Sequence, residues 1–416
     1  MVKIIPVSSF KPGSLTRSWQ SVPHPTLPLI ATPSSDKTVR VYSLRDFCLH
    51  STLEKGHNRS IRCVAWKPNL PTDSICLVTG SFDQTAGIWR RDEAAARAQT
   101  VKLETDFTGN TEDDEEEEMQ DDWAFTLVLE GHDAEIKSVA FSPGGQFLAT
   151  CSRDKSVWVW EDIGTDGEDE WETIAVLQDH DGDVKSVLWC PDNSDGELLA
   201  SASYDDTVRL SREDSEGEWV CVAVLQGHSG TVWGMDWESP PVKADGDDER
   251  PPATRPLRLI TCSSDLTIRV WRRVLPEGQP DRPPYSGIPS TMRPSGEEKW
   301  VCEATLPAAH DRDIYSVSWS KKTGRVASTG GDSKVVVYEE RPRPADVDVP
   351  SSPAAEQPSP ATAWHVLATL PLAHGPYEVN HVTWCPRFDA ARGDDGEMLV
   401  TTGDDGSVRA WAVVDE

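Results

Sequence analysis

A short hairpin motif recurs seven times along this 416-residue chain and limits the folds that the chain can adopt. Its clearest copy, LATCSRDKSVWVWE, runs from Leu148 to Glu161 as a small or apolar run, a polar turn, and a β-branched and aromatic run. This composition predicts a strand, a tight turn and a second strand. Each copy has an Asp six residues before its strand-ending position, which is Trp160 in this copy, and these are Asp36, Asp83, Asp154, Asp205, Asp265, Asp332 and Asp405. Such an internal repeat overrides the two or three domains that length alone suggests.

A second signal precedes six of the seven hairpins. A His opens another strand that ends in a bulky residue, as in EGHDAEIKSVAF from Glu130 and QGHSGTVWGMDW from Gln226. A short apolar strand, such as FTLVLE or TIAVLQ, lies before the His. Each unit therefore has four strands, a to d, with strand a after the His and the hairpin formed by b and c. The pattern resembles the WD-repeat β-propeller family over essentially the whole chain. We expect an all-β, seven-bladed propeller, with residues 1–416 as one domain.

In that family, the His, a Ser or Thr, the Asp and the final Trp form a hydrogen-bonded chain that ties the d–a loop to the b–c hairpin. The resemblance places four complete sets here: His57/Thr79/Asp83/Trp89, His132/Thr150/Asp154/Trp160, His228/Thr261/Asp265/Trp271 and His374/Thr401/Asp405/Trp411. Tyr replaces Trp at 42 and 338, and Ser211 replaces it in the fourth repeat. A set repeated around the chain fits a structural rule, whereas a catalytic triad would occur once. We therefore expect no catalytic residues and no enzyme.

The chain ends predict how the ring closes. The last repeat reaches its strand c at Val408 to Trp411, with only Ala412 to Glu416 beyond. The N-terminal segment VKIIPVSSF can supply the missing strand d. Closure of this kind removes exposed sheet edges.

Insertions distinguish the two faces of the expected ring. The spacing between successive Asp positions runs from 47 to 73 residues, and every long insertion falls between strands a and b or between c and d. In a propeller these loops emerge on one face, so the face made by d–a and b–c loops keeps short loops. We expect the insertions at 92–122 and 339–363 to be disordered, because the first is highly acidic and the second is rich in Pro, Ala and Ser.

Charge and cysteine usage exclude several classes of function. The formal net charge is −30, which disfavours general binding to nucleic acid or to anionic membranes. Between Glu104 and Asp122 there are eleven carboxylates and no Lys or Arg, which suits either a solvating loop or a dock for a basic partner such as a histone tail. None of the nine cysteines has CxxC spacing, so we expect small buried hydrophobes such as Cys63, Cys151, Cys221, Cys262 and Cys302, with no metal site and no cofactor.

The short-loop face carries the candidate binding residues. The residue four before the bulky end of strand a should point toward the centre of this face, and the residue before each Asp should lie close to it. Together these positions predict a basic arc facing an aromatic arc, formed by Arg62, Lys137, Arg153 and Lys185 and by Trp19, Trp233 and Tyr315. Scattered polar and aromatic residues without a ligand are the alternative. A peptide with a carboxylate and a large apolar side chain suits such a surface.

Several segments resemble one branch of the WD-repeat family more closely. LATCSRDKSVWVWE, ASASYDDTV, VKSV, TVWGM and the WVC segments at Trp219 and Trp300 are similar, in the same order, to the WD-repeat proteins of cytosolic iron–sulfur protein assembly. That resemblance implies an adaptor that joins a helical-repeat scaffold and a small acidic-loop factor in the targeting complex, which passes clusters to client apo-proteins. It also implies a functional exposed Arg in the SRDKS turn, here Arg153.

The same resemblance points to client tails that end in an acidic residue followed by an aromatic one. With no long apolar core at the N-terminus, we expect a cytoplasmic protein, with the nucleus as a second location. The alternative from another class is a generic WD-repeat scaffold or a substrate receptor in a chromatin or ubiquitin-ligase complex. Its support is the fold and the acidic segment.

Overall fold

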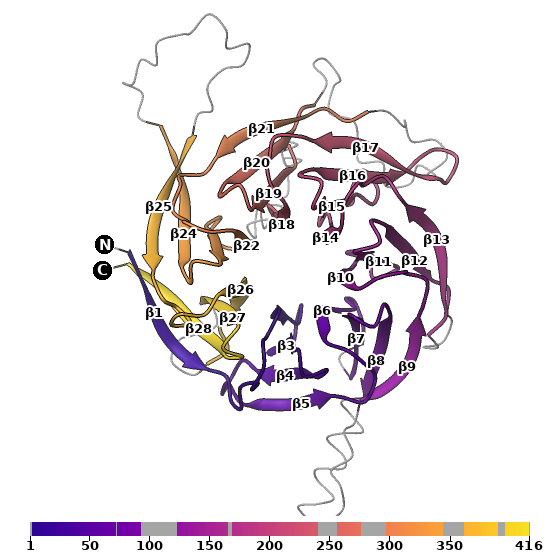
Figure 1. The fold of residues 1–416 in the computed structure, drawn as a ribbon, viewed down its shortest axis with the longest axis horizontal. Helices are drawn as coiled ribbons and strands as arrows, with labels where there is room; N and C mark the ends of the chain where they lie inside the picture. Colours follow the sequence, from indigo (N-terminus) through magenta and orange to yellow (C-terminus); the bar gives the residue numbers. More distant parts are fainter. Residues whose placement is uncertain are drawn as a thin grey trace, which may run out of the picture.

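The computed structural model describes residues 2–71, 73–92, 123–164, 169–239, 256–275, 297–343, 362–389 and 396–415. These residues form 28 strands in seven four-stranded sheets, arranged as blades around a ring (Figure 1). The all-β, seven-bladed propeller is therefore confirmed. In this part of the chain, no helix is long and apolar enough to cross a membrane.

Each blade contains strands a to d in that order, and blades are numbered along the chain. Blades 1 to 4 are β2 (Val22–Pro23), β3 (Leu29–Pro33), β4 (Val39–Ser43), β5 (Leu49–Leu53); β6 (Ile61–Trp66), β7 (Ser74–Ser81), β8 (Ala86–Asp92), β9 (Ala124–Leu129); β10 (Ile136–Phe141), β11 (Phe147–Ser152), β12 (Val157–Asp162), β13 (Trp171–Leu177); and β14 (Val184–Trp189), β15 (Leu199–Ser203), β16 (Val208–Glu213), β17 (Trp219–Leu225).

Blades 5 to 7 follow the same order. They are β18 (Val232–Trp237), β19 (Arg258–Ser263), β20 (Ile268–Arg273), β21 (Trp300–Thr305); β22 (Ile314–Trp319), β23 (Val326–Gly330), β24 (Val335–Pro342), β25 (Thr362–Leu370); and β26 (Val379–Pro386), β27 (Glu397–Gly403), β28 (Val408–Asp415) with β1 (Val2–Ser9) as strand d.

The ring closes as the sequence predicts. Strand β1 pairs antiparallel with β28, from Val2 opposite Asp415 to Ser9 opposite Arg409. The two chain ends therefore lie side by side in the same blade (Figure 1). The N-terminal strand completes blade 7, so the β28 edge is not left open to another chain.

The hydrophobic core lies between neighbouring blades. Val64 and Trp66 of blade 2 pack with Leu29 of blade 1 in one cluster, and Ile260 of blade 5 packs with Val317 of blade 6 in another. Because every blade face is covered by the next blade, the central strands b and c are apolar on both faces. This packing sets the a strands side by side around the centre.

Charged residues at the ends of the insertions tie blades together on the long-loop face. Asp169, just before β13, accepts hydrogen bonds from Arg90 of blade 2 at 2.6 and 2.8 Å. Glu298, just before β21, binds Arg212 of blade 4 at 2.8 Å and Arg273 at 3.1 Å. In these two places the residue that leads into strand d is a carboxylate, and its partner is an Arg near the end of a strand c.

The two expected insertions differ in what the structure describes. Residues 93–122 lie outside the described residues. In the second insertion, Glu339–Pro342 belong to β24 and Thr362 opens β25, where Pro342 pairs with Thr362. The expected range of 339–363 was therefore too wide at both ends, because the hairpin strands continue past the point where the apolar pattern stops. Residues 344–361 lie outside the described part of the chain.

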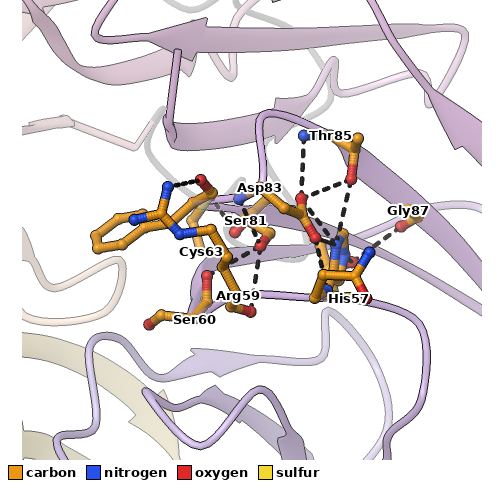
Figure 2. Close-up of polar contacts among 12 residues, drawn as sticks. His57, Arg59, Ser60, Cys63, Ser81, Asp83, Thr85 and Gly87 are labelled. Atoms are coloured by element: carbon orange, nitrogen blue, oxygen red, sulfur yellow. Dashed lines mark hydrogen bonds and ion pairs between the residues drawn. The ribbon is translucent and has the colours of Figure 1, made fainter.

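The hydrogen-bonded sets form in every blade that has the His. In blade 2, His57 Nδ1 bonds Asp83 Oδ2 at 3.0 Å and Nε2 bonds the Thr79 hydroxyl at 2.7 Å, while the Trp89 indole donates to Thr79 at 3.0 Å. Figure 2 shows Asp83 between His57 and Thr85. The set connects the d–a loop to the hairpin, and its repetition in the other five blades supports a structural role.

Blade 1 has a different hydrogen-bonded set because it lacks the His. Ser14, from the N-terminal segment, hydrogen-bonds Ser34 at 2.8 Å and Asp36 at 3.2 Å. Arg40 pairs with Asp36 at 2.8 Å, and the Tyr42 hydroxyl donates to the Pro12 carbonyl at 2.7 Å. The segment that closes blade 7 therefore also completes the polar set of blade 1.

The Asp of each set has a low pKa. Burial alone would raise the pKa of Asp265, but hydrogen bonds from Thr267 and His228 outweigh it and lower the pKa to about 2. The pKa values of Asp332 and Asp405 are also about 2, with burial opposed by His310 and His374. A carboxylate whose pKa is lower in the folded than in the unfolded chain stabilises the fold in its charged form.

We predict that acid destabilises the propeller in a defined window. Above the unfolded Asp pKa of about 3.9, the carboxylates of these sets contribute their full stabilisation to the free energy of unfolding. That stabilisation is lost as pH falls toward about 2. Each pKa lowered to about 2 is worth about 2 kcal/mol in the free energy of unfolding. Urea titrations at pH 5, 4, 3 and 2.5 should show a steep fall below pH 4. An unchanged midpoint over that range would contradict the prediction.

The cysteines only partly match the expectation. Six are buried: Cys63, Cys76, Cys151, Cys190, Cys262 and Cys385. Cys302 is exposed and Cys221 is half-buried, although both were expected to be buried. Both lie on strands d, β21 and β17, and this outermost strand of a blade is only partly covered by its neighbours.

Candidate functional site at the centre of the short-loop face

Seven equivalent backbone hydrogen bonds build the short-loop face. In each blade, the residue before the Asp donates its N–H to the carbonyl at the end of the d–a loop. The pairs are Ser35–Arg17, Phe82–Ser60, Arg153–Glu135, Tyr204–Asp183, Ser264–Thr231, Gly331–Asp313 and Asp404–Glu378, at 2.8 to 3.1 Å. The b–c turn is therefore held against the start of strand a, so the side chains of both positions face the same centre.

We call the residues at the second position of the a strands, together with Trp19, the inner ring. Its members are Trp19, Arg62, Lys137, Lys185, Trp233, Tyr315 and Asn380, one from each blade in order. Trp19 lies before β2, which has only two residues and ends at Pro23. Its N–H still donates to Pro33 at 3.1 Å, so the irregular backbone keeps Trp19 at the blade 1 position.

The three cations of the inner ring are consecutive, on blades 2 to 4, and its aromatic residues lie on blades 5, 6 and 1. The Arg62 guanidinium lies 4.8 Å from the centre of the Trp19 ring, and the Lys137 ammonium lies 4.5 Å from the Phe82 ring. Lys185 lies 5.1 Å from Trp233 and 5.5 Å from Tyr204. These are cation–π distances, so each cation is held by an aromatic ring of its own or a neighbouring blade.

The aromatic side chains are fixed by hydrogen bonds on their polar edges. The Trp19 indole donates to Ser60 at 3.0 Å, and the Trp233 indole donates to Ser264 at 2.7 Å. Trp233 and Tyr315 make an edge-to-face pair with ring centres 5.5 Å apart. The ring faces are thereby oriented before any ligand arrives, which lowers the ordering cost of binding.

Five carboxylates at this centre were missing from the predicted site. Glu135 and Asp183 lie beside Arg153 and Lys185, while Asp313, Glu378 and Asp404 lie on blades 6 and 7. Four of them occupy the position directly before strand a, as in HDAE, HDGD, HDRD and GPYE, so this position was the available signal. The face therefore has a mixed half and an acidic half.

The carboxylates divide the predicted cations into two classes. Lys185 pairs with Asp183 at 3.2 Å, and Arg153 lies 3.5 Å from Glu135 and 4.0 Å from Asp183. Arg62 and Lys137, in contrast, form no ion pair with any described residue.

Burial lowers the pKa of Arg62 and the pKa of Lys137. The Glu135 carboxylate opposes this effect for Lys137, while Lys185 and Arg62 lower the pKa of Lys137 further. Withdrawing like charges from water costs free energy, and Glu135 offsets that cost for Lys137 only in part, since the pKa of Lys137 stays lowered. The arrangement is therefore poised to accept an anion between blades 2 and 3.

Arg153 projects outward from the same face. Its side chain is 59% exposed, and its two carboxylate contacts lie at the outer limit of ion pairing. Tyr204, 62% exposed on the next blade, lies beside Lys185. The turn therefore presents a cation and an aromatic ring to solvent at the edge of the inner ring, where a bound protein can reach both.

The described part of the chain offers no metal centre. No three His, Cys, Asp or Glu side chains in it are placed to hold a metal ion. Burial raises the pKa of Cys63 to about 12, which keeps this thiol next to Arg62 protonated. What the site presents is charge and aromatic surface.

Comparison with known proteins agrees with the repeat architecture. The family model "WD domain, G-beta repeat" matches residues 47–90, 123–161, 171–210, 219–272 and 300–339. Proteins named "Probable cytosolic iron-sulfur protein assembly protein 1" are similar over nearly the whole chain. The one from Botryotinia fuckeliana is 52% identical, covering 98% of this chain and 96% of the relative; that from Pyricularia oryzae is 51% identical (99% and 96%), and that from Neurospora crassa 46% (99% and 96%).

Proposed function

Because the chain belongs to the WD40-repeat family of cytosolic iron–sulfur protein assembly protein 1, we propose that it is a non-catalytic adaptor of the targeting complex. In this role it helps to deliver iron–sulfur clusters to apo-proteins of the cytosol and nucleus. The cluster is cargo, carried by other members of the complex. We propose a cytoplasmic location, with the nucleus as the second.

The unpaired cations of the inner ring carry the proposal. Arg62 and Lys137 are desolvated and lack carboxylate partners among the described residues, while Trp19 and Phe82 hold them in place. A carboxylate is the ligand that such a pair accepts with charge-assisted hydrogen bonds. Trp233 and Tyr315 lie farther along the same ring and offer aromatic contact.

The proposed ligand is a client or adaptor tail that ends in an acidic residue followed by an aromatic one. Its carboxylates would bind at Arg62 and Lys137, and its ring would pack near Lys185 and Trp233. The protein partners are the helical-repeat scaffold and the small acidic-loop factor of the complex, with Arg153 as the exposed contact. Nucleic acid and membranes are not proposed partners, because the chain carries a net charge of −30.

We predict that Arg153→Glu leaves the fold intact and removes the assembly partners. The side chain is 59% exposed, so the free energy of unfolding should change by no more than about 0.5 kcal/mol. Affinity purification of the wild-type protein should recover the helical-repeat scaffold and iron–sulfur enzymes, and the variant should lose them.

Lys155→Glu is the matched control, because it makes the same charge change in the same exposed turn. It should retain the partners. An Arg153→Glu protein that unfolds much earlier than wild type would mean that Arg153 is structural. Recovery of cullin or histone complexes with the wild type would instead favour a substrate receptor.

A further inference from the structure

The short-loop face carries a second surface, of different chemistry, on blade 7. Among the described residues, the four most exposed large apolar side chains are Leu15 at 100%, Leu372 at 65%, Tyr204 at 62% and Tyr377 at 51%. All four lie in d–a loops or b–c turns. Leu372 and Tyr377 belong to one loop, residues 371–377 (PLAHGPY), which also exposes Pro371 and Pro376. We call these seven residues the apolar loop.

The apolar loop differs from its counterparts in the other blades. The equivalent loops around His57, His132, His180, His228 and His310 expose no large apolar side chain. A net charge of −30 makes a cluster of exposed Leu, Tyr and Pro still more unusual. Exposed apolar clusters on soluble proteins mark interaction sites.

One hydrogen bond within the apolar loop and two to Ser333 of blade 6 hold the loop in one conformation. The Gly375 N–H donates to the Leu372 carbonyl at 2.9 Å, the Ala373 N–H donates to Ser333 at 3.0 Å, and the Ser333 hydroxyl donates to the Tyr377 carbonyl at 2.6 Å. Leu372 has a φ of +53°, a left-handed conformation that a leucine rarely adopts. The equivalent residue of blade 2, Lys55, has a φ of +67°, so the backbone conformation is shared, and what is particular to blade 7 is the exposed leucine at that position.

Leu15 extends this surface across the blade 7 turn. The Ser14 N–H donates to the Gly406 carbonyl at 3.1 Å, and the Ser407 hydroxyl lies 3.1 Å from His374. The 404–407 turn therefore lies between Leu15 and the apolar loop. Carboxylates border it toward the centre, where Glu378 accepts from Tyr315 at 3.1 Å and Asp404 pairs with Arg17.

We propose that the apolar loop and Leu15 form a docking surface for a segment of another protein that carries apolar side chains together with Lys or Arg. The apolar residues match Leu372, Tyr377 and Leu15, and the cations match the Glu378 carboxylate, since Asp404 already pairs with Arg17. A second copy of this chain is disfavoured as the occupant, because two chains of charge −30 repel each other. This surface is separate from Arg62 and Lys137, so one propeller can hold a tail and a second partner together.

A peptide assay on the full chain tests the proposal. The probe is a fluorescent peptide of about 12 residues with leucines on one face and lysines on the other. Two further peptides replace lysine by glutamate or leucine by serine. At about 150 mM salt, where surface charge is largely screened beyond about 8 Å, the Leu/Lys peptide should bind saturably and the other two at least about tenfold more weakly. Equal binding of the Ser/Lys peptide or of the Leu/Glu peptide would overturn the proposal.

The variant pair locates the binding. The double substitution Leu372→Asn with Tyr377→Ser should weaken binding of the Leu/Lys peptide at least about tenfold. Asn is chosen at 372 because it tolerates the left-handed conformation of that residue. The control is Ile163→Ser with Leu275→Asn, which removes side chains of 43% and 44% exposure from the opposite face. It should bind as wild type.

Binding of the acidic-aromatic tail peptide provides the fold check, since neither double variant touches the inner ring. Failure of tail binding in the wild type would count against the proposed function alone. Unchanged Leu/Lys affinity in the loop variant would overturn this second surface alone. Sedimentation velocity tests whether a second copy of this chain occupies the surface. If the wild-type protein is a dimer and the loop variant is a monomer, the surface binds a second copy and the proposal is wrong.

Discussion

Asp265→Ala should lower the free energy of unfolding by about 3–5 kcal/mol, the cost of leaving one partner of a buried pair uncompensated. The Asp265 carboxylate accepts from His228 at 2.9 Å, from the backbone of Ser229 and Thr267 at 3.1 and 2.9 Å, and from the Thr267 hydroxyl at 2.6 Å. Its side chain is only 5% exposed. Water therefore cannot replace these interactions without opening the d–a loop.

Loss of the Asp265 carboxylate should also weaken other contacts in blade 5. Loss of Asp265 leaves the buried His228 ring with Thr261, which also accepts from the Trp271 indole at 2.9 Å, and with the Thr267 hydroxyl at 3.3 Å. Burial lowers the pKa of His228, and Asp265 is the group that raises it, so the ring should lose protons at still lower pH in the variant. The d–a loop and the hairpin of blade 5 would then be free to separate.

Denaturant unfolding followed by tryptophan fluorescence measures the effect. Asp181→Ala is the matched control, because Asp181 is an exposed Asp in the equivalent loop of blade 4. That substitution should stay within about 0.5 kcal/mol of wild type. If the two variants unfold at the same midpoint, the polar sets do not hold the blades together, and the account of the repeat is wrong.

The second large effect concerns the inner ring. Trp233→Ala should weaken binding of a labelled acidic-aromatic tail peptide by about 1–3 kcal/mol, the range of an aromatic interface anchor. Trp233 is oriented by Ser264 and packs edge to face on Tyr315, so truncation also removes the support of that ring. Fluorescence anisotropy at fixed salt gives the affinity directly.

The charged half of the same ring should respond to salt. Lys137→Ala and Arg62→Ala should weaken binding of the tail peptide at low ionic strength. The difference in affinity from wild type should shrink as the salt concentration rises. Lys185→Ala should matter less, because Lys185 already pairs with Asp183. Lys155→Ala, outside the inner ring in an exposed turn, serves as the control for general charge.

Amidation of the peptide's C-terminus separates carboxylate recognition from aromatic contact. It should weaken binding to the wild type and have little further effect on Lys137→Ala. Equal affinity for the amidated and free peptides, together with an unchanged Trp233→Ala, would remove the tail site from this face. The long-loop face, where Arg212 and Arg273 meet Glu298, would then be the next surface to test.

The sequence by itself determined the architecture of this protein. Short apolar runs, the polar turn that contains each Asp and the His of six repeats specify four strands and one polar set per blade, because these are local and repeated requirements. Closure by the N-terminal strand followed from the strand missing after Val408. The identities of the inner-ring residues also came from position in the repeat, and the structure brings them together at one centre.

Tertiary structure alone decided the chemistry of that centre. Asp183 pairs with Lys185 of its own blade and reaches Arg153 of blade 3, whereas nothing described forms an ion pair with Arg62 or Lys137. Glu135 precedes Lys137 at the spacing at which Asp183 precedes Lys185, and only the second couple forms an ion pair, so the pattern within one repeat cannot specify which cation is paired.

The same reasoning explains the other departures from expectation. Ser14 completes the polar set of blade 1 from across the ring closure, and Cys302 is exposed because strand d is the outer strand of its blade. Exposure of Leu372 and Tyr377 depends on how the 371–377 loop lies over the turn of blade 6. Local pattern fixes which strands form. Packing between blades determines which side chains are left without a partner, because it determines which charged and apolar groups are withdrawn from solvent.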